Sequence, residues 1–178
     1  AANFDTNLDK VKGQRVYHEL GVNLPITRDY GFFNASLMHR SIQYRLKTPD
    51  SNETRNESVS SWLGSIEGGL EFERDTELFG LLFTQTLEPR VQYLYAGYDD
   101  HAGIPDFDSA ELTFSYRQLF RNTRFSGYDR LADANQLSLG VTSRLIDTTT
   151  GKERVSTSFG QVINFQDQRV RLKESDAA

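Results

Sequence analysis

Apolar and polar side chains alternate along most of this sequence, and this alternation constrains the fold more than any other feature. Successive side chains of a β-strand point to opposite faces, so a period of two predicts strands with one apolar and one polar face. In the clearest case the apolar face carries Trp62, Ile66, Leu70 and Phe72. The pattern predicts six antiparallel strands, near residues 14–24, 32–46, 58–74, 80–96, 135–146 and 153–165.

The strand expected over 32–46 contains two competing alternations. One would place Phe33, Ala35 and Leu37 on a common face. The other would place Met38, Ile42 and Tyr44 on a common face of opposite parity. A β-bulge inserts one extra residue into a strand and so changes which face the following residues occupy. We therefore predict a bulge near residues 37–38.

The connections between the predicted strands alternate between short and long. The turns expected over 25–31, 75–79 and 147–152 are short, whereas the loops expected over 47–57 and 97–134 are longer. Bacterial membrane barrels place short turns on the periplasmic side and longer loops on the extracellular side. The alternation therefore predicts that the first strand runs toward the periplasm and that both long loops are extracellular.

The composition is too polar for membrane helices but allows membrane strands. Hydrophobic residues make up 37% of the 178 residues, and no run approaches the roughly 20 apolar residues that a spanning helix needs. A membrane strand needs only about 9–11 residues, half of them facing away from lipid. Six strands are too few to close, since the smallest membrane barrels need about eight. The predicted fold class is all-β: an antiparallel up-and-down transmembrane β-barrel segment, an incomplete barrel covering residues 1–178.

In such a barrel segment the two faces of each strand meet different surroundings. The residues predicted to face lipid are the apolar members of the alternating pattern: Trp62, Ile66, Leu70, Val91, Tyr93, Leu139 and Val141. The residues predicted to face the lumen are their charged neighbours: Glu67, Glu71, Glu88, Arg90 and Arg144. Charged groups at membrane depth need water or a partner, so this face either lines a hydrophilic conduit or carries mutually compensating charges.

Several functions are disfavoured by charge and residue type. The formal net charge is −5, whereas a nucleic-acid-binding surface would be basic. The chain has no cysteine, which excludes a thiolate metal site. His18 lies on a predicted strand with no evident serine and acidic partner of a hydrolase, so we predict no enzymatic activity and no cofactor. A calcium loop is disfavoured because the candidate ligands lack its ordered spacing: Asp99, Asp100, His101, Asp106 and Asp108.

The second long loop contains four arginines interleaved with aromatic residues: Arg117, Arg121, Arg124 and Arg130. Guanidinium groups suit phosphate recognition, and lipopolysaccharide phosphates lie at this level of an outer membrane. The competing interpretation is that Arg–Asp pairs and aromatic packing hold the loop together. The sequence favours the second interpretation and leaves the first open.

Five stretches of the chain resemble the barrel domain of the LPS-assembly protein LptD family. They are Arg15–Pro25 (RVYHELGVNLP), Leu70–Asp75 (LEFERD), Thr86–Tyr95 (TLEPRVQYLY), the run from Leu119 to Leu145, and Val155–Gln161 (VSTSFGQ). Their order and spacing cover most of the chain. The resemblance identifies the chain as an internal run of strands of that barrel, without the periplasmic jellyroll that precedes it.

The resemblance implies a function that patterning alone does not reach. Family members receive lipopolysaccharide from a periplasmic Lpt bridge through the jellyroll and, with the lipoprotein LptE as a barrel plug, insert it into the outer leaflet of the Gram-negative outer membrane. The expected partners are therefore LptE, lipopolysaccharide and that bridge. The alternatives are an outer-membrane porin or passive channel, a soluble β-sandwich or lipocalin-like protein, and a lipase that uses His18.

Overall fold

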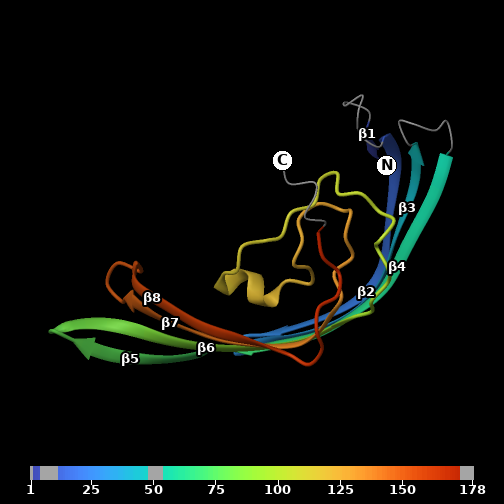
Figure 1. Cartoon of the computed structure of the whole chain (residues 1–178). Helices are drawn as coiled ribbons and strands as arrows, with labels where there is room; N and C mark the ends of the chain where they lie inside the picture. Colours follow the sequence, from blue (N-terminus) through green and yellow to red (C-terminus); the bar gives the residue numbers. More distant parts are fainter. Residues whose placement is uncertain (1, 5–11, 48–53, 173–178) are drawn as a thin grey trace.

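Eight strands pair antiparallel in one sheet of meander topology, shown in the computed structural model of Figure 1. The structure describes residues 2–4, 12–47 and 54–172. The strands are β1 (Ala2–Phe4), β2 (Lys12–Arg28), β3 (Gly31–Lys47), β4 (Thr54–Leu70), β5 (Phe72–Leu78), β6 (Leu81–Ala96), β7 (Ala134–Asp147) and β8 (Glu153–Asn164). Their order in the sheet is β1-β2-β3-β4-β6-β7-β8, with β5 also paired to β6.

The six predicted strands correspond to β2, β3, β4 together with β5, β6, β7 and β8, and β1 is an addition. The prediction that the chain is all-β and antiparallel is confirmed. The loop expected over 47–57 is shorter than predicted, because Lys47 pairs with Thr54 at the ends of β3 and β4. Residues 48–53 of that loop lie outside the described residues.

β4 and β5 are one continuous strand on a single register against β6. Gly69 pairs with Arg90 and Phe72 pairs with Leu87, which places Pro89 opposite Leu70. Proline has no N–H to donate, so the ladder is interrupted at this point while the register continues. The alternation of faces therefore runs unbroken from residue 62 to residue 72, as the sequence pattern predicts.

The bulge expected near residues 37–38 is wrong. The register of β3 with β2 and with β4 runs without a shift along the whole of β3. Instead, the polarity of the two faces reverses along the strand. In the half nearer Gly31, Phe33, Ala35 and Leu37 lie on one face, and in the other half Ile42 and Tyr44 lie buried on the opposite face.

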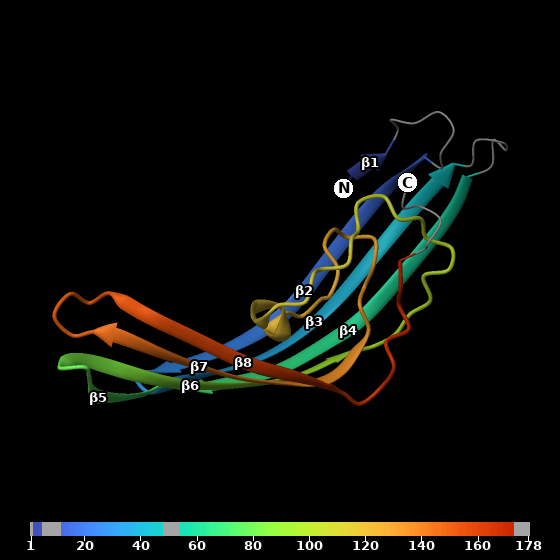
Figure 2. The ribbon, with the colours of Figure 1, turned by 60° about the vertical axis from the view of Figure 1, so that its left-hand side comes forward.

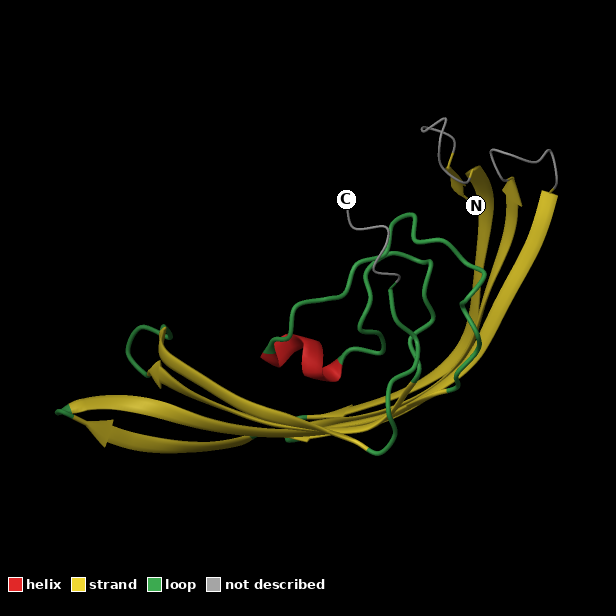
Figure 3. Ribbon diagram, viewed as in Figure 1, coloured by secondary structure: helices red, strands yellow, loops and turns green. Residues whose placement is uncertain are grey.

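The sheet is strongly curved, and the chain between β6 and β7 lies on its concave side (Figures 1 and 2). We call residues 97–133 the inner segment. It contains one short 3₁₀ helix, η1 (Tyr116–Phe120), and otherwise consists of loop, as Figure 3 shows. The described strands do not close: β1 and β8 each pair on one side alone. Within the described ranges, no helix has the length and apolarity needed to cross a bilayer.

The core lies between the concave face of the sheet and the inner segment. This position explains the reversed polarity of β3, because its buried residues contact the inner segment rather than a second sheet. The largest cluster of buried apolar side chains joins three strand residues of β3, one of β4 and two of the inner segment: Ile42, Tyr44, Leu46, Val59, Ile104 and Leu131.

Candidate functional site

The convex face of the sheet carries exposed apolar side chains on every long strand. Trp62, Ile66 and Leu70 of β4 are 58%, 54% and 47% exposed. Val91 and Tyr93 of β6 and Leu139 of β7 are likewise exposed on this face, whereas Val141 is half-buried. All seven residues predicted to face lipid thus lie on one side of the sheet, the side away from the inner segment.

The concave face below the inner segment is polar, and most of its charges pair across strands. Glu67 of β4 bonds to Arg90 of β6, and Glu88 of β6 bonds to Arg144 of β7 at 2.7 Å. Glu71 lies exposed, and the register of its neighbours places it opposite Glu88. All five residues predicted to face the lumen therefore lie on the concave side.

Asp129 joins the inner segment to strands β2 and β3 of the sheet. Its carboxylate is fully buried and accepts hydrogen bonds from the guanidinium of Arg15 on β2 and the hydroxyl of Tyr44 on β3. The backbone N–H groups of Phe107 and Asp108 also donate to it, at 2.8 and 2.7 Å. A buried carboxylate with this many donors is fully compensated, so the contact fixes the position of the segment.

Arg15 extends the same network to Asp108. Its two terminal nitrogens each donate to a different carboxylate oxygen of Asp108, both at 2.7 Å. Such two-pronged pairing is the strongest geometry for an arginine and a carboxylate. The hydrogen bonds from Arg15 lower the pKa of Asp108 to about 2, so this carboxylate stays charged through the physiological range.

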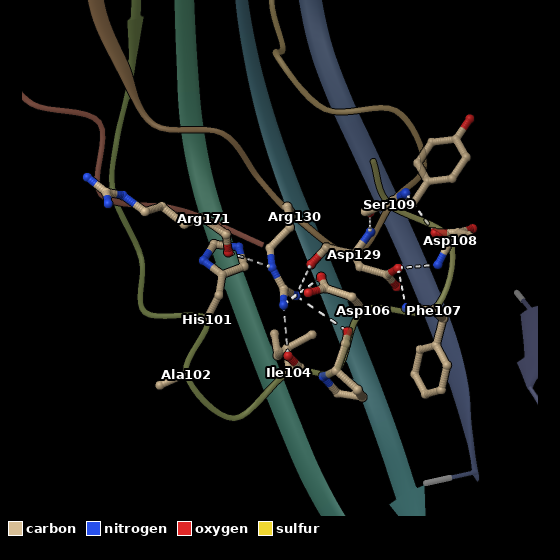
Figure 4. Close-up of polar contacts among 12 residues, drawn as sticks. His101, Ala102, Ile104, Asp106, Phe107, Asp108, Ser109, Asp129, Arg130 and Arg171 are labelled. Carbon is tan, nitrogen blue, oxygen red and sulfur yellow. Dashed lines mark hydrogen bonds and ion pairs between the residues drawn. The ribbon is translucent and has the colours of Figure 1, made fainter. Parts of the chain in front are cut away.

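Arg130 organises the interior of the segment itself (Figure 4). Its buried guanidinium pairs with Asp106 at 2.6 Å and donates to the carbonyl oxygens of Ile104 and Arg171. His101 lies beside it, with Nδ1 hydrogen-bonded to the carbonyl of Asp99 and Nε2 accepting the N–H of Leu131. Burial lowers the pKa of His101, and both bonds are those of a neutral ring.

The chain after β8 adds a further layer on the concave side. Asp133, at the end of the inner segment, accepts the backbone N–H groups of Arg169 and Val170 at 2.8 and 3.1 Å. Arg124 pairs with Asp133 and donates to the carbonyl of Val170. Burial acts to raise the pKa of Asp133, but these N–H bonds and Arg124 together lower it.

The comparisons with known proteins decide the family. A family model described as "LptD: LPS transport system D" matches residues 1–178. The chain belongs to the LptD family. The LPS-assembly protein LptD of Pseudomonas aeruginosa strain LESB58 is 45% identical over 175 residues, which cover 93% of this chain and 19% of that protein.

Two relatives from other genera agree. LptD of Xanthomonas oryzae pv. oryzae strain MAFF 311018 is 41% identical over 177 residues, covering 97% of this chain and 22% of the relative. LptD of Nitrosomonas europaea is 44% identical over 154 residues, covering 85% and 21%. The chain therefore spans about a fifth of the length of the LptD proteins that it matches. The predicted resemblance to the LptD family is confirmed.

For this LptD family member, the four arginines considered for phosphate binding fall into two pairs. Arg124 and Arg130 are engaged with carboxylates and carbonyl oxygens of the chain itself. Arg117 and Arg121, in and just after η1, are exposed. Arg121 also lines a cavity of about 270 Å³ between the inner segment and the ends of β7 and β8. A phosphate role stays a prediction, and Arg117 and Arg121 are the two arginines with room for it.

Other candidate sites are dispersed rather than assembled. Asp99 accepts the N–H of Ser60 and Asp100 that of Ala102, while the remaining acidic candidates of the loop pair with arginines. Among the residues that the structure describes, no group of three or more His, Asp or Glu side chains is placed to hold a metal. His18 is exposed on β2, and no hydrogen bond joins its ring to a serine or carboxylate in these described ranges.

Sequence reasoning missed the residues that matter most for the position of the inner segment. Alternation along the strand says only that Arg15 lies on a polar face, and no local pattern singles out Asp129. They lie 114 positions apart in the chain, beyond the reach of any local pattern. The one available signal was the excess of Asp and Arg in the second long loop, which favoured internal Arg–Asp pairs over ligand binding.

Proposed function

We propose that this chain is part of the wall of an outer-membrane β-barrel that, together with LptE, inserts lipopolysaccharide into the outer leaflet of the Gram-negative outer membrane. Family membership supplies lipopolysaccharide transport as the general role. The observation that carries the membrane assignment is the continuous apolar band on the convex face, opposite a polar, partly filled concave face.

The height of the apolar band supports a bilayer as its surroundings. Trp62 and Phe72 bound it on β4 and β5. Ten residues at about 3.3 Å each give about 33 Å along the strand. At a tilt of roughly 40° this becomes about 25 Å, the height of the apolar band on outer-membrane barrels. The occupied concave side favours a wall with a filled interior over the open conduit of a porin.

Cysteine labelling tests the membrane topology. The chain contains no cysteine, so the segment adds no background to single-cysteine variants of the full-length protein. On intact cells, a membrane-impermeant maleimide should label Asn56→Cys, in the exposed part of β4, and should not label Thr149→Cys, in the turn between β7 and β8. The reverse pattern would overturn the orientation, and equal labelling of both would overturn membrane insertion.

A chimera tests the transport role. The matched 175 residues of the Pseudomonas aeruginosa relative are exchanged for the corresponding part of this chain, and lipopolysaccharide at the cell surface is quantified. The chimera should deliver lipopolysaccharide, whereas a matched chimera that lacks the inner segment should deliver less. A chimera that assembles in the outer membrane but delivers none would contradict the proposal.

A further inference from the structure

The hairpin of β5 and β6 ends in an exposed apolar tip. Leu78 pairs with Leu81, which leaves Phe79 and Gly80 as a two-residue turn. Phe79 is 102% exposed, and Leu78, Leu81 and Leu82 are 39%, 60% and 61% exposed. Leu82 lies on the concave face and Leu81 on the convex face, because neighbouring residues of a strand alternate. The tip is thus apolar on both faces, which is unusual for a hairpin end in contact with water.

The turn itself is poorly suited to phenylalanine. Phe79 and Gly80 both have positive φ, 55° and 77°, as the central residues of a type I′ turn do. The first of these positions favours Asn, Asp or Gly, and an aromatic residue is disfavoured there. Phenylalanine at position 79 therefore does not stabilise the turn, which indicates that its side chain has a role outside the hairpin.

The tip lies beyond the apolar band of the convex face. Its position relative to the bilayer rests on the proposed function, in which that band contacts lipid. Leu78 is six residues past Phe72, about 20 Å along the strand. On the convex face of the hairpin a polar pair lies between the two, because Arg74 is opposite Gln85 and donates to it at 2.8 Å. A tilted strand would carry the tip about 15 Å below the hydrocarbon, so lipid chains cannot cover it.

The concave side of the same hairpin is acidic. Glu73, Asp75 and Glu77 are exposed on β5, opposite Thr86, Thr84 and Leu82 of β6. None of these opposing residues is a cation, so the directly paired strand leaves the three carboxylates uncompensated. An anionic lipid surface would be repelled by them, whereas a basic protein surface would be attracted.

We propose that the β5–β6 hairpin is a docking element for a protein partner, which receives Phe79 and the flanking leucines in an apolar pocket bordered by lysine or arginine. An aromatic side chain that fills a pocket, with charges at the edge, is the usual arrangement of an interface anchor. Phe79 supplies the anchor, and the carboxylates of β5 set the orientation of the partner.

Site-specific photocrosslinking in the full-length protein, in cells, tests the docking. A photoreactive phenylalanine analogue in place of Phe79 should give a discrete polypeptide adduct whose mapped peptide contains basic residues. The analogue at Thr149, in the polar β7–β8 turn, is the matched control and should give none. Glu77→Lys should abolish the adduct at position 79, and Lys/Arg→Glu in the mapped peptide should restore it.

A second variant separates docking from folding. Phe79→Asn suits the turn better than phenylalanine, so the hairpin should stay folded while copurification with the mapped partner is lost. The analogue at Ile66, on the convex face, should crosslink to lipid. Loss of the Ile66 lipid adduct would contradict the proposed membrane placement. A normal Ile66 adduct, with only lipid adducts or no discrete product at position 79, would overturn the docking inference alone.

Discussion

Asp129 and Arg15 connect a segment of loop to a strand more than a hundred residues earlier in the chain. Both side chains are buried, and each has several partners. Buried ion pairs contribute little net stability when complete, but removing one member leaves the other charge uncompensated. The effect of a substitution here therefore depends on which partners are left without a bond, rather than on the charge that is removed.

Asp129→Ala should loosen the inner segment. The substitution deprives Arg15, Tyr44 and two backbone N–H groups of their common acceptor, at a cost of about 3–5 kcal/mol. Limited proteolysis of the folded protein in detergent should show much faster cleavage within residues 97–133. Asp167→Ala removes an exposed carboxylate and should leave the cleavage rate unchanged. Equal rates for both variants would show that Asp129 does not hold the segment.

His101 should make the inner segment sensitive to mild acid. Its pKa is lowered by burial, so below the unfolded-state pKa of about 6.5 the unfolded segment binds a proton that the folded segment does not. The stabilisation is complete above that pH and is lost as pH falls toward the lowered pKa, by up to about 1.4 kcal/mol per pH unit. Hydrogen exchange of the Leu131 amide, measured from pH 7.5 to 5, reports this loss. In His101→Gln the loss of protection of this amide with falling pH should disappear. A loss of protection that persists would assign the effect to another group.

At the scale of elements, η1 packs on the sheet through glycines. A Cβ atom at Gly140 of β7 would lie 2.7 Å from Cζ of Phe120 and 2.8 Å from the hydroxyl oxygen of Tyr116. Real atoms do not approach so closely, so the absence of a side chain at this position lets the helix lie against the strand. Ser138 and Thr142, on either side, hydrogen-bond to Leu119 and Tyr116 and hold the helix there.

Gly140→Val should displace η1 from β7. Overpacking at such a contact costs about 1–3 kcal/mol, and the Ser138 and Thr142 bonds would be lost with the contact. The rate of tryptic cleavage after Arg117 measures how accessible this residue is, and this rate should increase. Gly64→Ala is the control, because a Cβ there would meet its nearest neighbour at 3.9 Å and should change nothing. Unaltered cleavage in Gly140→Val would show that η1 does not depend on this close approach.

The strands and their two faces were largely predictable from the sequence, because alternation along a strand is a local property. The faces of β4, β5 and β6 follow it from Trp62 to Tyr95 without exception among the residues singled out. The bulge predicted in β3 is wrong, because the second half of this strand is buried by Ile104 and Leu131 from a distant part of the chain. The contacts of Asp129 and Arg130 could not be predicted from the sequence for the same reason, because each depends on how the inner segment folds against the sheet.

At the scale of the whole molecule, the two surfaces of the sheet should respond oppositely to charge. Ile66 lies on the convex face midway between the aromatic residues that bound the band, and Glu71 lies on the concave face of the same strand. Ile66→Arg should reduce folding of the full-length protein into phosphatidylcholine vesicles by about 2–4 kcal/mol, the cost of an arginine at the bilayer midplane. Glu71→Arg should not reduce it, because it places a cation opposite Glu88.

The comparison with detergent micelles distinguishes a lipid effect from a packing effect. Urea titration in micelles, which adapt to a polar side chain more readily than a bilayer does, should show a smaller difference between the two variants. An equal loss for Ile66→Arg in micelles and vesicles would mean that the convex face does not contact lipid. An equal loss for both variants in vesicles would mean that the two faces are not distinguished by their surroundings.

The reversal of polarity along β3 has a consequence for how far the wall rises. Seventeen residues at about 3.3 Å each give roughly 56 Å, well over the thickness that a tilted strand needs to cross hydrocarbon. The additional length is the half of β3 that contains Ile42, Tyr44 and Leu46, where the apolar face is the concave one and the polar face is the convex one. On the membrane placement proposed above, this half of β3 would extend into water beyond the bilayer. An estimate of membrane thickness taken from hydropathy along β3 would then wrongly count this half of the strand as membrane-spanning.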